Sequence, residues 1–204
     1  MSPKFMESHG RIGLFGGTFD PPHWGHIRTS SSAADELRLD QVAFIPAPHP
    51  PHKQGQIHTP YEIRRQMVAS CLPLDSRFRL CLVEEKEDLP GTTLQTVRKL
   101  RQLGFTEDRC HLIWLTGSDS LLELGSWYRP EELLDSIEVA VMPRPGFPLE
   151  QAEDRFLKKV RLLNTPLIEF TSSEIRARRQ NLEESVPKAV AEIISKHGLY
   201  KLTK

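Results

Sequence analysis

Short apolar runs alternate with longer amphipathic stretches along this chain. A short apolar run predicts a strand, and apolar positions that recur every three or four residues predict a helix. The predicted strands are residues 11–15, 41–46, 78–84, 111–116, 138–142 and 167–170. The predicted helices are residues 24–39, 92–104, 120–124, 130–136, 150–163 and 185–197, with further helix starts near residues 59 and 171. This alternation predicts an α/β fold with a doubly wound, mainly parallel sheet.

The helix that starts near residue 59 has a favourable first turn. Thr59 is predicted as its N-cap, Pro60 as its first helical residue and Glu62 as the partner in a capping box. The apolar pattern that follows places Arg64 on the solvent side of this helix. Residues 84–88 are predicted to be a solvated run of charges.

Residues 13–26, with the sequence GLFGGTFDPPHWGH, join the first predicted strand to the first predicted helix. Gly16 and Gly17 lack Cβ atoms and tolerate positive φ, so the main chain there can approach a ligand closely. The two prolines of the stretch force an extended turn and delay the start of the helix. His23 and His26 then share one face of the first helical turn, where free N–H groups favour an anion. Together these features predict a nucleotide site.

Other interpretations of this stretch are an ordinary strand-to-helix turn or half of a zinc site. Its glycine spacing fits neither a Walker A loop nor a dinucleotide fingerprint. The three cysteines are scattered, and no His-Glu-x-x-His sequence follows, so zinc ligation is not favoured.

Three further segments carry candidate binding residues. Asp119 follows the predicted strand 111–116, where open α/β sheets bind their ligands, although it also suits a helix N-cap. Trp127 and Tyr128 are adjacent in a loop and suggest a stacking platform for a heteroaromatic ring, although a buried Trp is ordinary core material. Residues 171–176 place hydroxyls and an arginine at a helix start, which predicts either a second anion site or plain N-capping.

Two proline-rich loops complete the candidate site. The loop 47–58 is stiffened by prolines and presents His52 and Lys53, for which a binding role and a solvated surface loop stay equally open on the residues alone. Residues 143–146 form a rigid turn that is placed to cover a nucleotide.

Composition narrows the function classes. The 204 residues include 27 Lys and Arg and 27 Asp and Glu, and this zero net charge does not favour bulk nucleic-acid binding. Three cysteines without metal or redox spacing predict reduced thiols in a cytoplasmic protein. No apolar run is long enough to span a bilayer, and residues 1–10 are too polar for a signal peptide. We expect an N-terminal extension over 1–10 and a single domain over 11–204.

Residues 16–26 resemble the signature of the nucleotidylyltransferase superfamily, and specifically that of the bacterial nicotinate-nucleotide adenylyltransferase family. The resemblance runs from Arg11 to Tyr200 and rests on five motifs in family order. It implies a Rossmann-like nucleotidylyltransferase fold and transfer of the adenylyl group of ATP to nicotinate mononucleotide in NAD biosynthesis. The chain departs from the family pattern at Thr92, where the family has Tyr, and in the hydroxyl types around residues 171–173.

The resemblance also implies roles for individual residues. His23 and His26 are the implied catalytic pair. The implied ATP contacts are Gly16, Gly17, Thr18, Phe19, Asp119, Ser172, Ser173 and Arg176. The implied contacts to nicotinate mononucleotide are His52, Lys53, Thr93, Trp127 and Tyr128. Mg²⁺ is expected to arrive with ATP rather than at a metal site of the protein.

The expected partners are therefore ATP and nicotinate mononucleotide, with no nucleic acid and no membrane, in a monomer or a homo-oligomer. Two alternatives stay open. One is a sister nucleotidylyltransferase that acts on nicotinamide mononucleotide, phosphopantetheine or an alcohol phosphate. The other is a noncatalytic nucleotide-sensing module.

Overall fold

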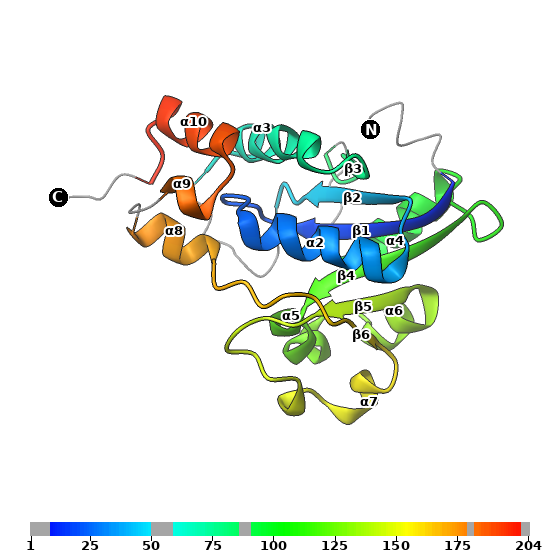
Figure 1. The fold of residues 1–204 in the computed structure, drawn as a ribbon. Helices are drawn as coiled ribbons and strands as arrows, with labels where there is room; N and C mark the ends of the chain where they lie inside the picture. The colour runs from blue at the N-terminus through cyan, green and yellow to red at the C-terminus, as the bar shows by residue number, and fades with distance from the viewer. Residues whose placement is uncertain (1–8, 50–58, 86–90, 179–181, 201–204) are drawn as a thin grey trace.

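The apolar runs form one six-stranded sheet in a computed structural model that describes residues 9–49, 59–85, 91–178 and 182–200. The strands are β1 (Gly10–Gly17), β2 (Gln41–Pro46), β3 (Phe78–Leu80), β4 (Cys110–Gly117), β5 (Glu138–Met142) and β6 (Arg161–Leu162). Their order is β3-β2-β1-β4-β5-β6, and each neighbouring pair is parallel. The predicted doubly wound α/β fold is confirmed (Figure 1).

Helices cover both faces of the sheet because the side chains of each strand alternate between two cores. Phe15 belongs to one core, with apolar residues of α2 (Trp24–Leu37), α3 (Tyr61–Cys71) and α10 (Lys188–Lys196). Leu14 belongs to the other core, with residues of α4 (Thr93–Gln102), α5 (Ser118–Leu122) and α6 (Pro130–Ser136). The shorter elements are η2 (Leu72–Leu74), η3 (Leu124–Ser126), η4 (Leu149–Gln151), α7 (Asp154–Leu157), α8 (Ser172–Arg178) and α9 (Leu182–Ser185).

The C-terminal third differs most from the predicted elements. The helix predicted over 150–163 is wrong, because η4, α7 and β6 divide this segment. The strand predicted over 167–170 is also wrong, and Leu167, which suggested it, is 62% exposed. The helix predicted over 185–197 is split, because Pro187 forms the N-cap of α10 and separates it from α9.

Two predictions around α3 and α4 are wrong for a shared reason, namely that polar side chains found partners inside the molecule. Thr59 does not cap α3, whose N-cap is Pro60, and its hydroxyl instead donates to the Tyr200 hydroxyl. Glu84 is not solvated, since it is buried and accepts a hydrogen bond from the Thr96 hydroxyl at 2.5 Å. Burial is the main cause that raises the pKa of Glu84.

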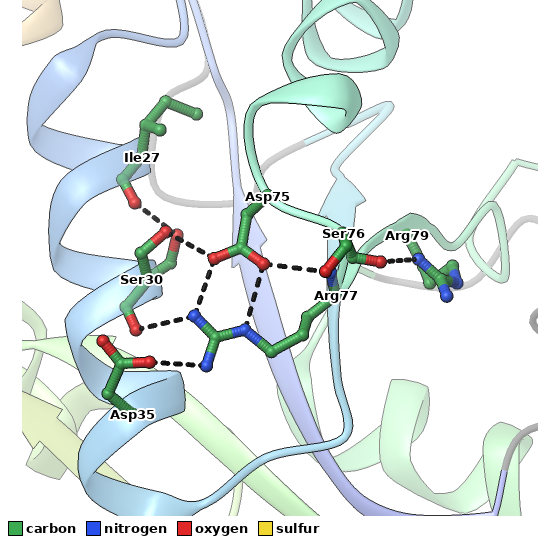
Figure 2. Close-up of polar contacts among 8 residues, drawn as sticks. Ile27, Ser30, Asp35, Asp75, Ser76, Arg77 and Arg79 are labelled. Carbon is green, nitrogen blue, oxygen red and sulfur yellow. Dashed lines mark hydrogen bonds and ion pairs between the residues drawn. The ribbon is translucent and has the colours of Figure 1, made fainter.

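An ion-pair network joins α2 to the segment before β3 (Figure 2). The Arg77 guanidinium donates to both carboxylate oxygens of Asp75 and to the carboxylate of Asp35. Hydrogen bonds from Arg77 lower the pKa of Asp75 to about 2. This network lies at the N-terminal end of β3. In such folds ligands bind at the carboxyl ends of the strands, so the network is on the side of the sheet away from them.

None of the helices within the described ranges combines the length and apolar character that crossing a membrane requires.

Candidate active site

The candidate site lies where the strand order reverses, outside the carboxyl ends of β1 and β4. These two strands are neighbours, while β2 and β5 continue the sheet in opposite directions. In open α/β sheets ligands bind at such a switch point. The end of β1 and the loop that follows it carry residues 16–23, which we call the signature turn, and Asp119 lies in the first turn of α5, directly after β4.

The glycines of the signature turn are required by close packing. A Cβ on Gly16 would lie 2.7 Å from the Trp114 ring, and a Cβ on Gly17 would lie 2.9 Å from the Phe19 ring. The positive φ of the turn falls on Phe19, at 50°, whose side chain is almost wholly buried. Phe19 is therefore a core residue that leaves only its main chain to a ligand.

The two histidines meet at the start of α2. His23 is the N-cap of this helix, and His26 lies in its first turn. Their ring centroids are 3.8 Å apart, and the backbone N–H of His23 donates to His26 Nδ1 at 3.2 Å. The prediction that the pair shares one face of the helix start is thus confirmed.

His23 is held as a neutral ring with open hydrogen-bonding capacity. Its side chain is 1% exposed, and neither ring nitrogen makes a well-formed hydrogen bond to a described residue, although the ring faces the backbone N–H of His26 in a capping-box arrangement. Burial, with a smaller contribution from the charge of Arg144, lowers the pKa of His23 to about 3. Buried polar groups are normally paired, so these nitrogens indicate a place that a ligand completes.

Asp119 pairs with a residue that the sequence did not single out. The Arg144 guanidinium donates to Asp119 Oδ2 at 2.6 Å, and the Arg144 backbone N–H donates to the Ser118 hydroxyl at 2.9 Å. Asp119 Oδ1 is buried and has no hydrogen-bond partner among the described residues. The alternative that Asp119 caps a helix is wrong, since Gly117 is the N-cap of α5. The position of Arg144 after β5 was the available signal for this pair.

The second predicted anion site reaches the signature turn directly. The Ser172 hydroxyl donates to the Pro21 carbonyl at 2.9 Å. Arg176 donates to the Asp20 carbonyl at 2.8 Å and to the Ser173 hydroxyl at 3.2 Å. The fold therefore brings α8 beside the signature turn, although these two segments are about 150 residues apart in the chain.

Arg64 is another residue whose position was predicted wrongly from the sequence. It is 1% exposed rather than on the solvent side of α3. Its guanidinium donates to the carbonyls of Thr18 at 2.7 Å, Ala47 at 2.9 Å and Thr59 at 3.1 Å. Thr18 belongs to the signature turn, whereas Ala47 and Thr59 both belong to the connection between β2 and α3, so Arg64 ties these two segments together. Nothing in the local pattern of α3 signals these distant partners.

A pocket opens between the start of α4 and the segment that joins η3 to α6. It holds about 380 Å³ of empty space that opens to solvent, and its lining residues are Gly91, Thr92, Thr93, Leu94, Trp127, Tyr128 and Leu133. Three residues assigned to the acceptor from sequence, Thr93, Trp127 and Tyr128, therefore line one pocket. The other two, His52 and Lys53, lie outside the described residues.

Some of the polar groups that line this pocket already make hydrogen bonds within the protein. Thr92 is the N-cap residue of α4, and its hydroxyl donates to Gln95 Oε1 at 2.8 Å. The backbone N–H groups of Gln95 and Thr96 donate to the Thr92 carbonyl, so the N–H groups of Thr93 and Leu94 are the ones at this helix start that can meet an anion in the pocket.

Within 9–49, 59–85, 91–178 and 182–200, no group of three His, Cys, Asp or Glu side chains is arranged to hold a metal ion. Mg²⁺ bound to a nucleotide needs only one or two protein carboxylates beside phosphates and water.

Comparisons with known proteins identify the family and the fold. Residues 14–178 match the profile of the family described as Cytidylyltransferase-like. A probable nicotinate-nucleotide adenylyltransferase from Thermus thermophilus is 39% identical, with 94% of this chain and 100% of the relative covered. A second, from Clostridium tetani, is 31% identical, with 92% and 98% covered.

The fold is also found in solved structures. Plasmodium falciparum nicotinic acid mononucleotide adenylyltransferase complexed with NaAD matches with a TM-score of 0.75 at 19% identity, covering 96% of this chain and 99% of that one. Its complex with APC gives a TM-score of 0.73 at 18% identity, with the same coverage.

Proposed function

The chain belongs to the nicotinate-nucleotide adenylyltransferase family, within the cytidylyltransferase-like group, and we propose that it transfers the adenylyl group of ATP to nicotinate mononucleotide. The products are nicotinate adenine dinucleotide and pyrophosphate. The observation that carries the proposal is the His23–His26 pair at the switch point of the sheet, in which both ring nitrogens of His23 are buried without a well-formed hydrogen bond to a described residue.

The chemistry needs little covalent help from the protein. A phosphate oxygen of nicotinate mononucleotide attacks the α-phosphorus of ATP, and the bond from that phosphorus to the bridging oxygen of pyrophosphate breaks. The attacking phosphate is largely ionised at neutral pH because its second pKa is about 6. The site must therefore align two polyanions and stabilise the charge that grows between them.

We assign this work to residues already placed. The ring N–H groups of His23 and His26 donate to the α-phosphoryl oxygens, where charge develops. Main-chain groups of Gly16, Gly17, Thr18 and Phe19 contact the nucleotide, and Asp119 accepts from its ribose. Ser172, Ser173 and Arg176 receive the β- and γ-phosphates at the start of α8. Because the donors of Ser172 and Arg176 hold turn carbonyls in this structure, bound phosphates would have to share or replace these bonds.

Mg²⁺ is proposed as part of the substrate. Bound across the triphosphate, it would neutralise charge on the phosphates and on the departing pyrophosphate.

The acceptor is assigned to the pocket at the start of α4. Trp127 and Tyr128 supply aromatic surface for the pyridine ring, and the Thr93 hydroxyl with the first N–H groups of α4 supplies donors for the carboxylate. His52 and Lys53 are proposed to neutralise the phosphate of the same nucleotide.

The test is pyrophosphate release from MgATP with each acceptor separately. Nicotinate mononucleotide should support the fastest release, with nicotinate adenine dinucleotide as the product. Faster release with nicotinamide mononucleotide, phosphopantetheine or an alcohol phosphate would identify a sister enzyme. ATP binding without release with any acceptor would indicate a nucleotide-sensing module.

A further inference from the structure

The C-terminal segment of the chain reaches back to the signature turn. The Tyr200 hydroxyl donates to Asp20 Oδ1 at 2.7 Å, across 180 positions of sequence. The same hydroxyl accepts a hydrogen bond from Thr59 Oγ1 at 3.1 Å. Asp20 and Thr59 are each 2% exposed, and Tyr200 between them is partly buried.

The Tyr200 hydroxyl is a permanent donor in this arrangement. Burial, together with the negative charge of Asp20, raises the pKa of Tyr200 well above its usual range. The phenol is therefore protonated at neutral pH and acts as a donor. A hydrogen bond from such a donor to a buried carboxylate belongs to the stronger class of hydrogen bonds.

Asp20 links Tyr200 to the histidines, because its position in the signature turn affects where His23 and His26 lie. It lies three residues before His23, the N-cap of α2. Its backbone carbonyl accepts from Arg176, and its carboxylate accepts from Tyr200. The residue is thus held from two sides, by α8 and by the C-terminal segment.

Packing alone does not account for Tyr200. Its ring packs against the core on the α10 side of the sheet, a contact that does not require the hydroxyl. Its backbone, however, adopts φ of 56°, in the left-handed region that non-glycine residues seldom occupy. The conformation carries a cost and coincides with the hydroxyl contact to the turn.

We propose that Tyr200 is a positioning residue for adenylyl transfer, acting through Asp20 to hold the signature turn so that His23 and His26 meet the α-phosphoryl group. This inference rests on the proposed function. Tyr200 itself touches neither substrate.

The test compares Tyr200→Phe with Tyr61→Phe in the full-length protein. Tyr61 is a matched control, because its hydroxyl is buried and makes no hydrogen bond to any described residue. At saturating MgATP and nicotinate mononucleotide, Tyr200→Phe should lower kcat roughly tenfold, the scale of one lost hydrogen bond to a charged group. KM for ATP should stay within about twofold, and Tyr61→Phe should change neither constant.

A double-mutant cycle identifies the route. If Tyr200 acts through Asp20, then adding Tyr200→Phe to Asp20→Asn should lower kcat much less than it does in the parent protein. A kcat for Tyr200→Phe within about twofold of the parent, with only a lower Tm, would reduce the residue to a packing role. Independent, multiplicative losses in the cycle would also overturn the proposal.

A second measurement separates this inference from the proposed function. Hydrogen exchange of a peptide spanning residues 14–26, measured without substrates, should be faster in Tyr200→Phe than in the parent or in Tyr61→Phe. If the parent releases no pyrophosphate, the proposed function fails. Faster exchange in Tyr200→Phe would still support the inference that Tyr200 holds the signature turn. Unchanged exchange in Tyr200→Phe would contradict a role for Tyr200 in holding the signature turn, whatever the activity of the parent.

Discussion

The backbone N–H of His23 donates to Nδ1 of His26 at 3.2 Å, and this contact determines which nitrogen of His26 carries the proton. A ring nitrogen that accepts a hydrogen bond has no hydrogen of its own, so the neutral His26 ring is protonated on Nε2. The start of α2 thus sets the tautomer of a proposed catalytic residue. We propose that Nε2–H is the group that donates to a phosphoryl oxygen.

The first prediction follows from this donor. His26→Ala should lower kcat for adenylyl transfer roughly a hundredfold or more, the scale of one lost donor to a developing oxyanion. KM for ATP should change much less, because the interaction strengthens in the transition state. His111→Ala is the control, since His111 pairs with Glu138 at the N-terminal ends of β4 and β5, away from the candidate site. A His26→Ala enzyme that kept its kcat and lost only ATP affinity would contradict the assignment.

The second prediction concerns the stability cost of burying His23. Its pKa is about 3 in the folded protein and 6.5 when unperturbed, so protons favour the unfolded chain between these values. The contribution of the neutral ring is complete above pH 6.5 and is lost as the pH falls towards 3. The upper limit of this loss is about 1.4 kcal/mol per pH unit.

Urea unfolding of the parent and of His23→Gln at pH 7.5, 5.5 and 4.5 measures this contribution. The free energy of unfolding should fall more steeply with acid in the parent than in the variant. Parallel pH dependences for the parent and His23→Gln would show that His23 is not buried as a neutral ring.

The sheet and the signature turn are predictable from the sequence because their signals lie in adjacent residues. The apolar runs of β2 and β5 give their bounds directly, and the stretch from Gly16 to His26 carries its own glycines, prolines and histidines. The pocket was also foreseen, because Trp127 and Tyr128 stand side by side in the chain. The roles assigned to these residues stay predictions.

The contacts that hold the site together are not predictable in this way. Arg64 follows a helical pattern that places it in solvent, yet its carbonyl partners at Thr18 and Ala47 are 46 and 17 positions away. Tyr200 meets Asp20 across 180 positions. Such contacts depend on where loops return after the sheet has formed, and no local periodicity encodes that. Local periodicity also misled at Leu167, because an apolar residue reads as part of a strand whether or not the fold buries it, and Leu167 is exposed.

The third prediction concerns the ion-pair network of Figure 2, which should support stability without supporting catalysis. Asp75 is largely buried and its pKa is lowered to about 2 from 3.8, mainly by hydrogen bonds from Arg77. The stabilising contribution of its charge is present above pH 3.8 and is lost as the pH falls through about 2. Asp75→Asn should lower the free energy of unfolding at pH 7 by about 1–2 kcal/mol.

The matched control for this network is Asp135→Asn, at an exposed ion pair with Lys159. Exposed pairs contribute about 0–1 kcal/mol, so this variant should unfold nearly like the parent. Both variants should retain the kcat of the parent at 25 °C. A large loss of kcat in Asp75→Asn, without unfolding, would show that the network also shapes the site.

The last prediction concerns acceptor choice and rests on the pocket at the start of α4. Nicotinate carries a carboxylate where nicotinamide carries an amide. The Thr93 hydroxyl and the first N–H groups of α4 are donors, so they suit the carboxylate and leave the NH₂ of the amide unpaired. An unpaired buried polar group costs about 1–3 kcal/mol, which predicts a preference for nicotinate mononucleotide of at least about tenfold in kcat/KM.

Two substitutions separate the carboxylate contact from stacking. Thr93→Val removes one donor and should erode the preference for nicotinate mononucleotide, whereas Thr106→Val, at an exposed threonine outside the pocket, should leave it unchanged. Trp127→Ala should weaken both acceptors equally, because stacking does not distinguish an acid from an amide. The Thr92 hydroxyl is held by Gln95, so the position where the family has Tyr contributes no free donor through its side chain. Equal kcat/KM values for the two mononucleotides in the parent protein would show that this pocket does not select the acid, even if adenylyl transfer itself is observed.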